Sequence, residues 1–153
     1  MRTRPPGRRQ QGLALIELLV VLTILAMVAT FAAPSLSRQV GALGFDRAVS
    51  ELKDTLKRAR MEAMRRQRET WVEIDVANAG YRAGGESTNL PDGLSASLLT
   101  ARRELVSDGV GRIRFFPDGA STGGAIILRD GGRAKEIRVD WFDGGVAVAH
   151  AAP

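Results

Sequence analysis

Few side chains of this sequence are suited to catalysis. It contains one histidine, His150, and no cysteine. His150 stands close to the C-terminal end, so a nucleophile paired with this histidine would depend on a fraying segment. The acidic residues are scattered and form no EF-hand pattern. We therefore expect no enzyme, no metal site and no cofactor.

Glu17 is the side chain whose position implies unusual chemistry. It is the one charged residue within residues 13–34, which are otherwise almost entirely apolar. A carboxylate inside a bilayer costs roughly 2.5–3.5 kcal/mol at the centre of a helix and less near its end. Glu17 therefore either extends to the membrane interface or needs a cationic partner.

The segment around Glu17 has the length of a membrane span. A helix over residues 13–34 measures roughly 33 Å, close to the hydrocarbon thickness of a bilayer. Four arginines and no acidic residue precede it. The positive-inside rule then predicts that residues 1–12 stay in the cytoplasm and that the larger part of the chain crosses the membrane. The small-residue junction Gly12-Leu13 lies before the apolar run, so cleavage there keeps the helix, unlike cleavage of a secretory signal.

Residues 12–22 resemble the class III leader of type IV pilins and type II secretion pseudopilins. In this family a prepilin peptidase cuts after the glycine and methylates the new terminal amine. The resemblance implies cleavage between Gly12 and Leu13, methylation on Leu13, and Glu17 as the fifth residue of the mature chain. Pro34 stands where the family commonly has a helix-kinking proline.

The implied cleavage also supplies a partner for Glu17. It creates an ammonium on Leu13, and in a helical stack the carboxylate of one subunit can meet the terminal amine of a neighbour. Two charges that are costly in an apolar core then neutralise each other only when subunits assemble.

Composition limits the remaining possibilities. The chain has 153 residues, and the part after the apolar segment is enough for one domain. The net charge is +5, but four of the 22 basic residues lie within residues 1–12, and the others nearly balance the 17 acidic ones. We therefore do not expect nucleic acid as the main partner. The lack of cysteine excludes a disulfide framework.

Residues 35–69 have the pattern of an amphipathic helix that continues the apolar one. Pro34 predicts local bending at the junction. The polar face carries arginines and lysines with acidic partners, such as Glu62 for Arg66, and either solvent or a neighbouring subunit covers it. Apolar residues recur at intervals of three and four. This stripe consists of Phe45, Val49, Leu52, Leu56, Ala59 and Ala63.

From residue 70 onward, short segments in which apolar and polar residues alternate with a period of two are separated by frequent turn residues. We expect antiparallel β-sheets that close over the apolar stripe of the helix. Residues 84–93 are predicted to form a loop, and residues 94–106 are either strand or loop. The expected strands are residues 70–76, 81–83, 112–116, 125–129, 136–142 and 146–149. The aromatic side chains expected in the core of the sheets are Trp71, Tyr81 and Trp141.

A second resemblance lies in residues 113–128. This strand, glycine-rich loop and strand are similar to the GspH group of type II secretion pseudopilins and to the FimT/FimU-like minor pilins. We expect the loop to be a hairpin connection. The less favoured alternative is a phosphate-binding loop, because no helix or P-loop lysine follows. The loop residues are Pro117, Asp118, Gly119, Ser121, Thr122, Gly123 and Gly124.

The two resemblances together imply an α+β, type IV pilin-like fold, in which a long N-terminal helix has a membrane-spanning first half and an amphipathic second half. They imply a minor pseudopilin, a structural subunit in the tip region of the type II secretion pseudopilus. It would lie in the bacterial inner membrane with a periplasmic C-terminal domain. The implied partners are the other minor pseudopilins, the major pseudopilin, the prepilin peptidase, the inner-membrane assembly platform and membrane lipid.

Two other classes of function are weighed against this one. A minor type IV pilin in pilus assembly or DNA uptake would use the arginine-rich helix together with Arg112 and Arg114. A membrane-tethered periplasmic enzyme would need an active site, and the sequence offers none.

Overall fold

The computed structural model describes residues 9–151, with side chains for residues 14–28 and 43–151. The chain divides into two compact units, Met1–Ala42 and Leu43–Pro153. Helix α1 runs from Arg9 to Arg66 and contributes residues to both units. Gly12, Leu13 and Pro34 lie on α1, but their side chains are outside the described residues, as is most of the predicted leader.

In the first unit, residues 14–28 of α1 expose every side chain. Leu15 and Leu19 are 68% and 66% exposed. Among the residues whose side chains are described, no helix combines the length and the apolarity needed to cross a membrane. The predicted span, residues 13–34, extends beyond residues 14–28 at both ends, so part of it lies outside the residues whose side chains are described.

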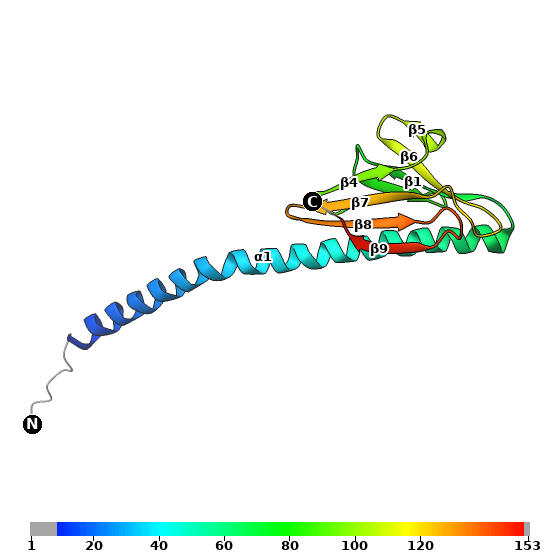
Figure 1. The fold of residues 1–153 in the computed structure, drawn as a ribbon. Helices are drawn as coiled ribbons and strands as arrows, with labels where there is room; N and C mark the ends of the chain where they lie inside the picture. The colour runs from blue at the N-terminus through cyan, green and yellow to red at the C-terminus, as the bar shows by residue number, and fades with distance from the viewer. Residues whose placement is uncertain (1–8, 152–153) are drawn as a thin grey trace, which may run out of the picture. The chain divides into compact units, whose positions relative to one another are not determined.

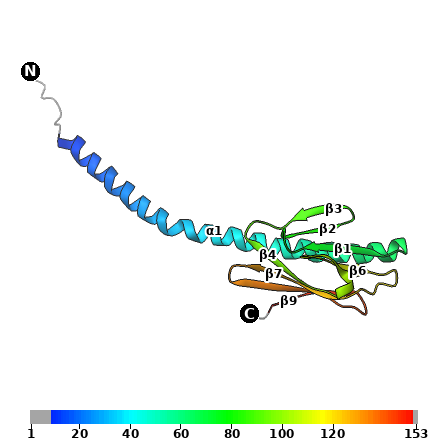
Figure 2. The same ribbon diagram turned by 90° about the horizontal axis from the view of Figure 1, so that it is seen from above.

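The second unit contains two antiparallel sheets beside residues 43–66 of α1 (Figures 1 and 2). The strand order is β3-β2-β1-β6-β5 in the five-stranded sheet and β4-β7-β8-β9 in the four-stranded sheet. The elements after α1 are β1 (Thr70–Asp75), β2 (Gly80–Ala83), β3 (Glu86–Asn89), β4 (Leu94–Leu99), η1 (Arg102–Glu104), β5 (Leu105–Ser107), β6 (Val110–Phe115), β7 (Gly124–Asp130), β8 (Arg133–Val139) and β9 (Val146–His150). The prediction of an α+β fold with antiparallel sheets is confirmed.

The apolar stripe of α1 lies in the core of the second unit. Phe45, Leu52 and Leu56 are at most 1% exposed, and Ala59 packs against the core as a partly buried residue. Strands β1 and β6 alternate between buried and more exposed side chains, as strands with one covered face do. The predicted stripe is therefore confirmed. The sheet residues that share this core include Val72, Ile74, Ile113, Phe115, Ile126, Leu128, Ile137 and Val139.

The prediction of a loop over residues 84–93 is wrong for residues 86–89, which form strand β3. All four residues of β3 are exposed and polar, so the strand has no alternating pattern that the sequence could reveal. Its position depends on a tight turn in which Gly84 and Gly85 both have positive φ, which matches the twist of paired strands. Backbone pairing with β2 then defines the strand.

Two of the three aromatic predictions are also wrong. Tyr81 is 9% exposed, but Trp71 is 46% and Trp141 68% exposed. Val72 faces the core from β1, so its neighbour Trp71 points to the opposite face of the sheet. Trp141 lies beyond the end of β8 at Val139, in a turn rather than in the strand that was predicted to reach residue 142.

Candidate functional site

The glycine-rich loop connects two different sheets. Residues 116–123, which we call the linking loop, join β6 of the five-stranded sheet to β7 of the four-stranded sheet. The predicted hairpin is therefore wrong, because β6 pairs with β1 and β5 and β7 pairs with β4 and β8. Turn residues mark a change of direction without indicating which strands pair. At the end of the loop Gly124 has a φ of 150°, and a Cβ there would lie 2.7 Å from the carbonyl oxygen of Leu99.

The amides of the linking loop are used internally. Each amide from Gly119 to Gly123 donates a hydrogen bond to a protein acceptor at 2.9–3.0 Å. A phosphate-binding nest needs successive amides directed toward the ligand. This loop does not provide them. The acceptors are Phe116 O, Asp118 Oδ1, Trp141 O, Arg114 O and Ser121 Oγ.

The linking loop fixes a second turn, residues 140–145 between β8 and β9, which we call the aromatic turn. Ser121, which is 6% exposed, donates through Oγ to the carbonyl oxygen of Asp140 at 2.7 Å and through its amide to that of Trp141 at 3.0 Å. A Cβ on Gly123 would lie 3.0 Å from the Cβ of Trp141. Two residues of the predicted family loop thus determine where the aromatic turn lies.

The aromatic turn is itself tightly bonded. Asp140 Oδ1 accepts the amides of Phe142 at 2.7 Å and Asp143 at 3.4 Å, and Asp143 Oδ1 accepts that of Gly145 at 2.7 Å. The rings of Trp141 and Phe142 make an edge-to-face contact with centroids 5.7 Å apart. These bonds fix the backbone of the turn that carries the two exposed aromatic side chains.

One arginine of helix α1, Arg60, contacts both the linking loop and the aromatic turn. Arg60 Nε donates to the carbonyl oxygen of Gly119 at 3.1 Å. Gly144 has a φ of 64° and packs against the same carbonyl group so closely that a Cβ would collide with it. The linking loop, the aromatic turn and α1 therefore meet at Arg60.

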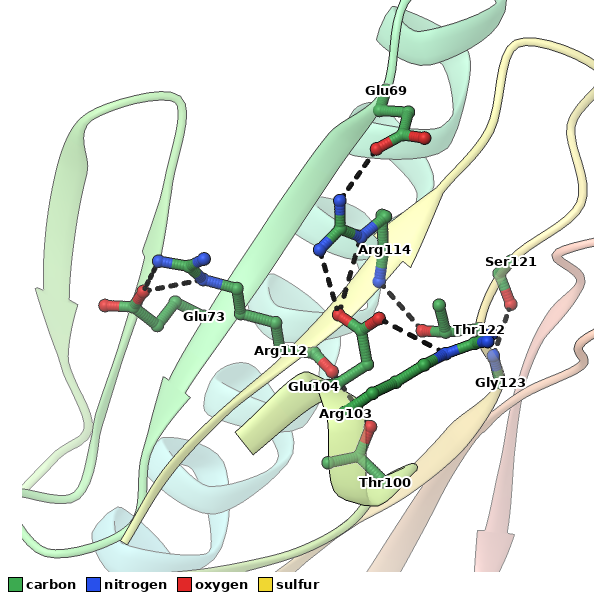
Figure 3. Close-up of polar contacts among 10 residues, drawn as sticks. All are labelled: Glu69, Glu73, Thr100, Arg103, Glu104, Arg112, Arg114, Ser121, Thr122 and Gly123. Carbon is green, nitrogen blue, oxygen red and sulfur yellow. Dashed lines mark hydrogen bonds and ion pairs between the residues drawn. The ribbon is translucent and has the colours of Figure 1, made fainter. Parts of the chain in front are cut away.

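A charged cluster lies beside the linking loop, as Figure 3 shows. Glu104 is only 4% exposed, and its carboxylate lies 3.5 Å from Arg114 Nε and 3.8 Å from Arg103 Nε. Arg114 also binds Glu69 at 2.7 Å. The hydrogen bond that Arg114 donates to Glu69, helped by the charge of Glu104, raises the pKa of Arg114 above its ordinary value. No sequence pattern predicts this cluster, because Glu104 lies in residues 94–106, which have no clear strand or helix period.

Arg112, which lies on β6 with Arg114, also forms an ion pair with a carboxylate. Its Nη2 lies 2.9 Å from Glu73 Oε2, and its guanidinium stacks 5.4 Å from the ring centre of Trp71. Glu73 also pairs with Arg82 at 3.3 Å. Both arginines that could have favoured DNA binding thus form ion pairs with carboxylates of the same unit, Arg112 with Glu73 and Arg114 with Glu69 (Figure 3).

The other predicted site residues belong to the first unit. Glu17 lies among the exposed side chains of residues 14–28. Gly12, Leu13 and Pro34 lie on α1 outside residues 14–28 and 43–66, and so outside the residues whose side chains are described.

Comparisons with known proteins identify the family. The model of the family described as type II transport protein GspH matches residues 48–145, and the prokaryotic N-terminal methylation motif matches residues 7–33. A type II secretion system protein H of Xanthomonas campestris pv. campestris is 31% identical over 147 residues, which cover 95% of this chain and 87% of that protein.

Solved structures show the same fold. The type IV minor pilin FimU of Pseudomonas aeruginosa matches with a TM-score of 0.53 and 17% identity, over 71% of this chain and 92% of that one. The minor pseudopilin EpsH of the Vibrio cholerae type 2 secretion system matches with a TM-score of 0.55 and 13% identity, over 69% and 96%. The predicted pilin-like fold is confirmed, and the matches to the family model and to the curated relative show that this chain belongs to the GspH family of type II secretion proteins.

Proposed function

We propose that this chain is processed at Gly12, held in the bacterial inner membrane by residues 13–34, and extracted into the tip region of a type II secretion pseudopilus. There it serves as a structural subunit in protein export across the outer membrane. Residues 1–12 would lie in the cytoplasm and residues 70–153 in the periplasm. The observation that carries this proposal is Glu17, the single carboxylate among the exposed and otherwise almost entirely apolar side chains of residues 14–28, in a chain of this family.

Processing is tested first. The match to the methylation motif over residues 7–33 supports cleavage between Gly12 and Leu13. Gly12→Val should leave an intact chain with residues 1–12 attached, measured by mass spectrometry of the protein from its own host. Gly132→Ala is the control, since a Cβ there meets nothing within 4 Å. A shortened and methylated chain in the Gly12 variant would contradict this assignment.

Glu17 is tested by assembly. In the proposed fibre its carboxylate pairs with the terminal ammonium of a neighbouring subunit, so both charges are neutralised in an apolar core. Glu17→Ala should spare membrane insertion and strongly reduce incorporation and secretion. Thr23→Ala is a matched control, because the Thr23 hydroxyl already donates to the Leu19 carbonyl at 2.6 Å within its own helix. Normal secretion and normal co-purification of Glu17→Ala with other pseudopilins would count against the proposal.

The partners follow from the same proposal. They are the other minor pseudopilins, the major pseudopilin, the prepilin peptidase, the inner-membrane assembly platform and the surrounding lipid. Co-purification after cross-linking of the full chain in its host would identify which of these contact it directly.

The rival function is that of a minor type IV pilin, and the likeness to FimU favours it. The likeness to EpsH has a similar TM-score, so the fold does not distinguish the two fibres. Relatedness to a type II secretion protein H at 31% identity favours secretion. Deleting the gene should stop export through the type II system and leave pili and DNA uptake intact. The opposite result would make the chain a minor pilin.

A further inference from the structure

We propose that the aromatic turn is a docking surface for a neighbouring pilin-like subunit, and that this subunit presents an arginine or lysine flanked by apolar side chains. The inference rests on the proposed function, since it assumes incorporation into a fibre. In this proposal the linking loop has a role in assembly, because it holds the backbone of the aromatic turn in place.

The first argument is exposure combined with rigidity. Trp141 and Phe142 are 68% and 74% exposed although they are adjacent and aromatic. Isolated exposed apolar residues are ordinary, but two adjacent aromatic rings form a larger apolar patch, and tryptophan is among the residues that most often dominate binding energy. Because the hydrogen bonds of Ser121, Asp140 and Asp143 already fix the backbone of the turn, little backbone freedom is lost when a partner binds.

The second argument is the extent of the apolar surface. Leu99 is 72% exposed, and with Trp141 it lines a shallow hollow of about 440 Å³. Small residues of the crossing between the sheets, Gly123, Gly124 and Ala125, also line this hollow. An apolar side chain of a partner can enter it beside the indole ring.

The third argument is charge. Asp118 lies beside the aromatic turn, because the carbonyl group of the next residue, Gly119, packs against Gly144. Asp118, Asp140 and Asp143 each use Oδ1 to accept a local amide. Among residues 43–151, none of these three carboxylates forms an ion pair with a lysine or an arginine.

One arginine, Arg60, reaches the two turns, where its Nε donates to the carbonyl oxygen of Gly119 and its side chain lies beside Gly144. Arg138 is paired with Glu136 at 2.8 Å. Three carboxylates against the one guanidinium of Arg60 leave the two turns with a net negative charge. A partner cation is attracted to it and can stack on the indole face of Trp141.

The decisive experiment places a photo-cross-linking amino acid at position 142 of the full chain in cells with the complete secretion system. The expected product is an adduct with another pilin-like subunit. The control is the same amino acid at position 71, where the native Trp71 is also exposed but stacks against Arg112. The inference is overturned if position 142 yields no adduct in a processed, secretion-competent chain, or if its adduct is with an exported protein or an outer-membrane component.

Two variants measure the contributions separately. Trp141→Ala with Phe142→Ala should lower co-purification of the partner subunit by at least about tenfold. Its unfolding midpoint should stay close to that of the native chain, because both rings are exposed. Asp118→Asn with Asp143→Asn keeps the Oδ1 acceptors and removes two charges, so it should lower the yield of adduct at position 142 severalfold. An unchanged yield would contradict the basic partner.

Different results would contradict the proposed function and the proposed docking surface. Secretion that is independent of the whole gene would remove the proposed function. Secretion that needs the gene but is unaffected by Trp141→Ala with Phe142→Ala would remove only the docking surface.

Discussion

The two described stretches of α1 have similar apolar residues and opposite surroundings. In residues 14–28 the leucines and valines are exposed, with Leu19 at 66%. In residues 43–66 the stripe residues are buried, with Leu56 at 0%. The first stretch is apolar on all sides, whereas the second is apolar on one side. A helix that is apolar all round needs an apolar environment around it, such as lipid or other helices, while an amphipathic helix is covered by its own domain.

This difference indicates how one helix can serve two purposes. The second stretch is covered by the two sheets of the same chain. The first stretch has no such cover within the part of the chain that the structure describes. Its apolar surface, together with Glu17, is therefore available to the membrane and to neighbouring subunits.

The largest expected effect comes from comparing equivalent substitutions in the two stretches. Leu56→Ala should lower the free energy of unfolding by about 2–5 kcal/mol, because it leaves a cavity in a closed core. Leu19→Ala should change it by less than about 0.5 kcal/mol, because that side chain is exposed. Urea unfolding of the full chain in detergent micelles measures both. Equal destabilisation by the two variants would show that Leu19 and Leu56 do not differ in how much packing they contribute to the folded chain.

A smaller effect is expected where the turns meet the second stretch. Gly144→Ala should destabilise by roughly 1–3 kcal/mol, because the residue has a positive φ and its Cβ would collide with the carbonyl oxygen of Gly119. Gly131→Ala is the control, with a φ of 54° and open space around the Cβ. It should cost only the backbone strain, about 1 kcal/mol. Thermal unfolding of the two variants separates strain from packing, and equal losses would exclude a packing role for Gly144.

The smallest effect concerns the beginning of the second stretch. Asp46 on α1 accepts a hydrogen bond from Lys135 Nζ on β8 at 2.7 Å, and this bond lowers the pKa of Asp46 below its ordinary value. A lowered pKa in the folded state stabilises the fold above the ordinary carboxyl pKa, and this contribution is lost as the pH falls through the folded-state value. Asp46 is exposed to solvent and Lys135 is only partly buried, so the contribution is small.

Asp46→Asn should therefore lower the unfolding midpoint slightly at pH 7. The difference from the native chain should begin to shrink as the pH falls below about 4, and it should disappear once Asp46 is protonated in the folded state. Lys135→Met should have a similar effect, and the double variant should lose no more than either single variant. Additive losses would show that the two side chains do not interact.

Much of the fold follows from local sequence patterns. The stripe from Phe45 to Ala63 has a helical period, and the structure buries it. Strands β1 and β6 likewise largely coincide with the strands predicted over residues 70–76 and 112–116. The family, too, is recognisable from the leader around Gly12 and from the residues of the linking loop, because these are short continuous motifs.

The candidate surface could not be predicted in the same way. Trp71 and Trp141 were expected in the core, but their orientation depends on the inward position of Val72 and on the end of β8. The buried carboxylate of Glu104 is stabilised by Arg114 of β6, and the sequence pattern around Glu104 does not predict this contact.

The sequence alone determined which residues form the helix, which of its faces is apolar, and where a single acid interrupts the apolar segment. These properties depend on residues a few positions apart. Only the tertiary structure decided that the linking loop joins two sheets and that Ser121 fixes the backbone of Asp140 and Trp141. The reason is that strand pairing and contacts between distant segments depend on the packing of the whole domain, which no short stretch of sequence contains.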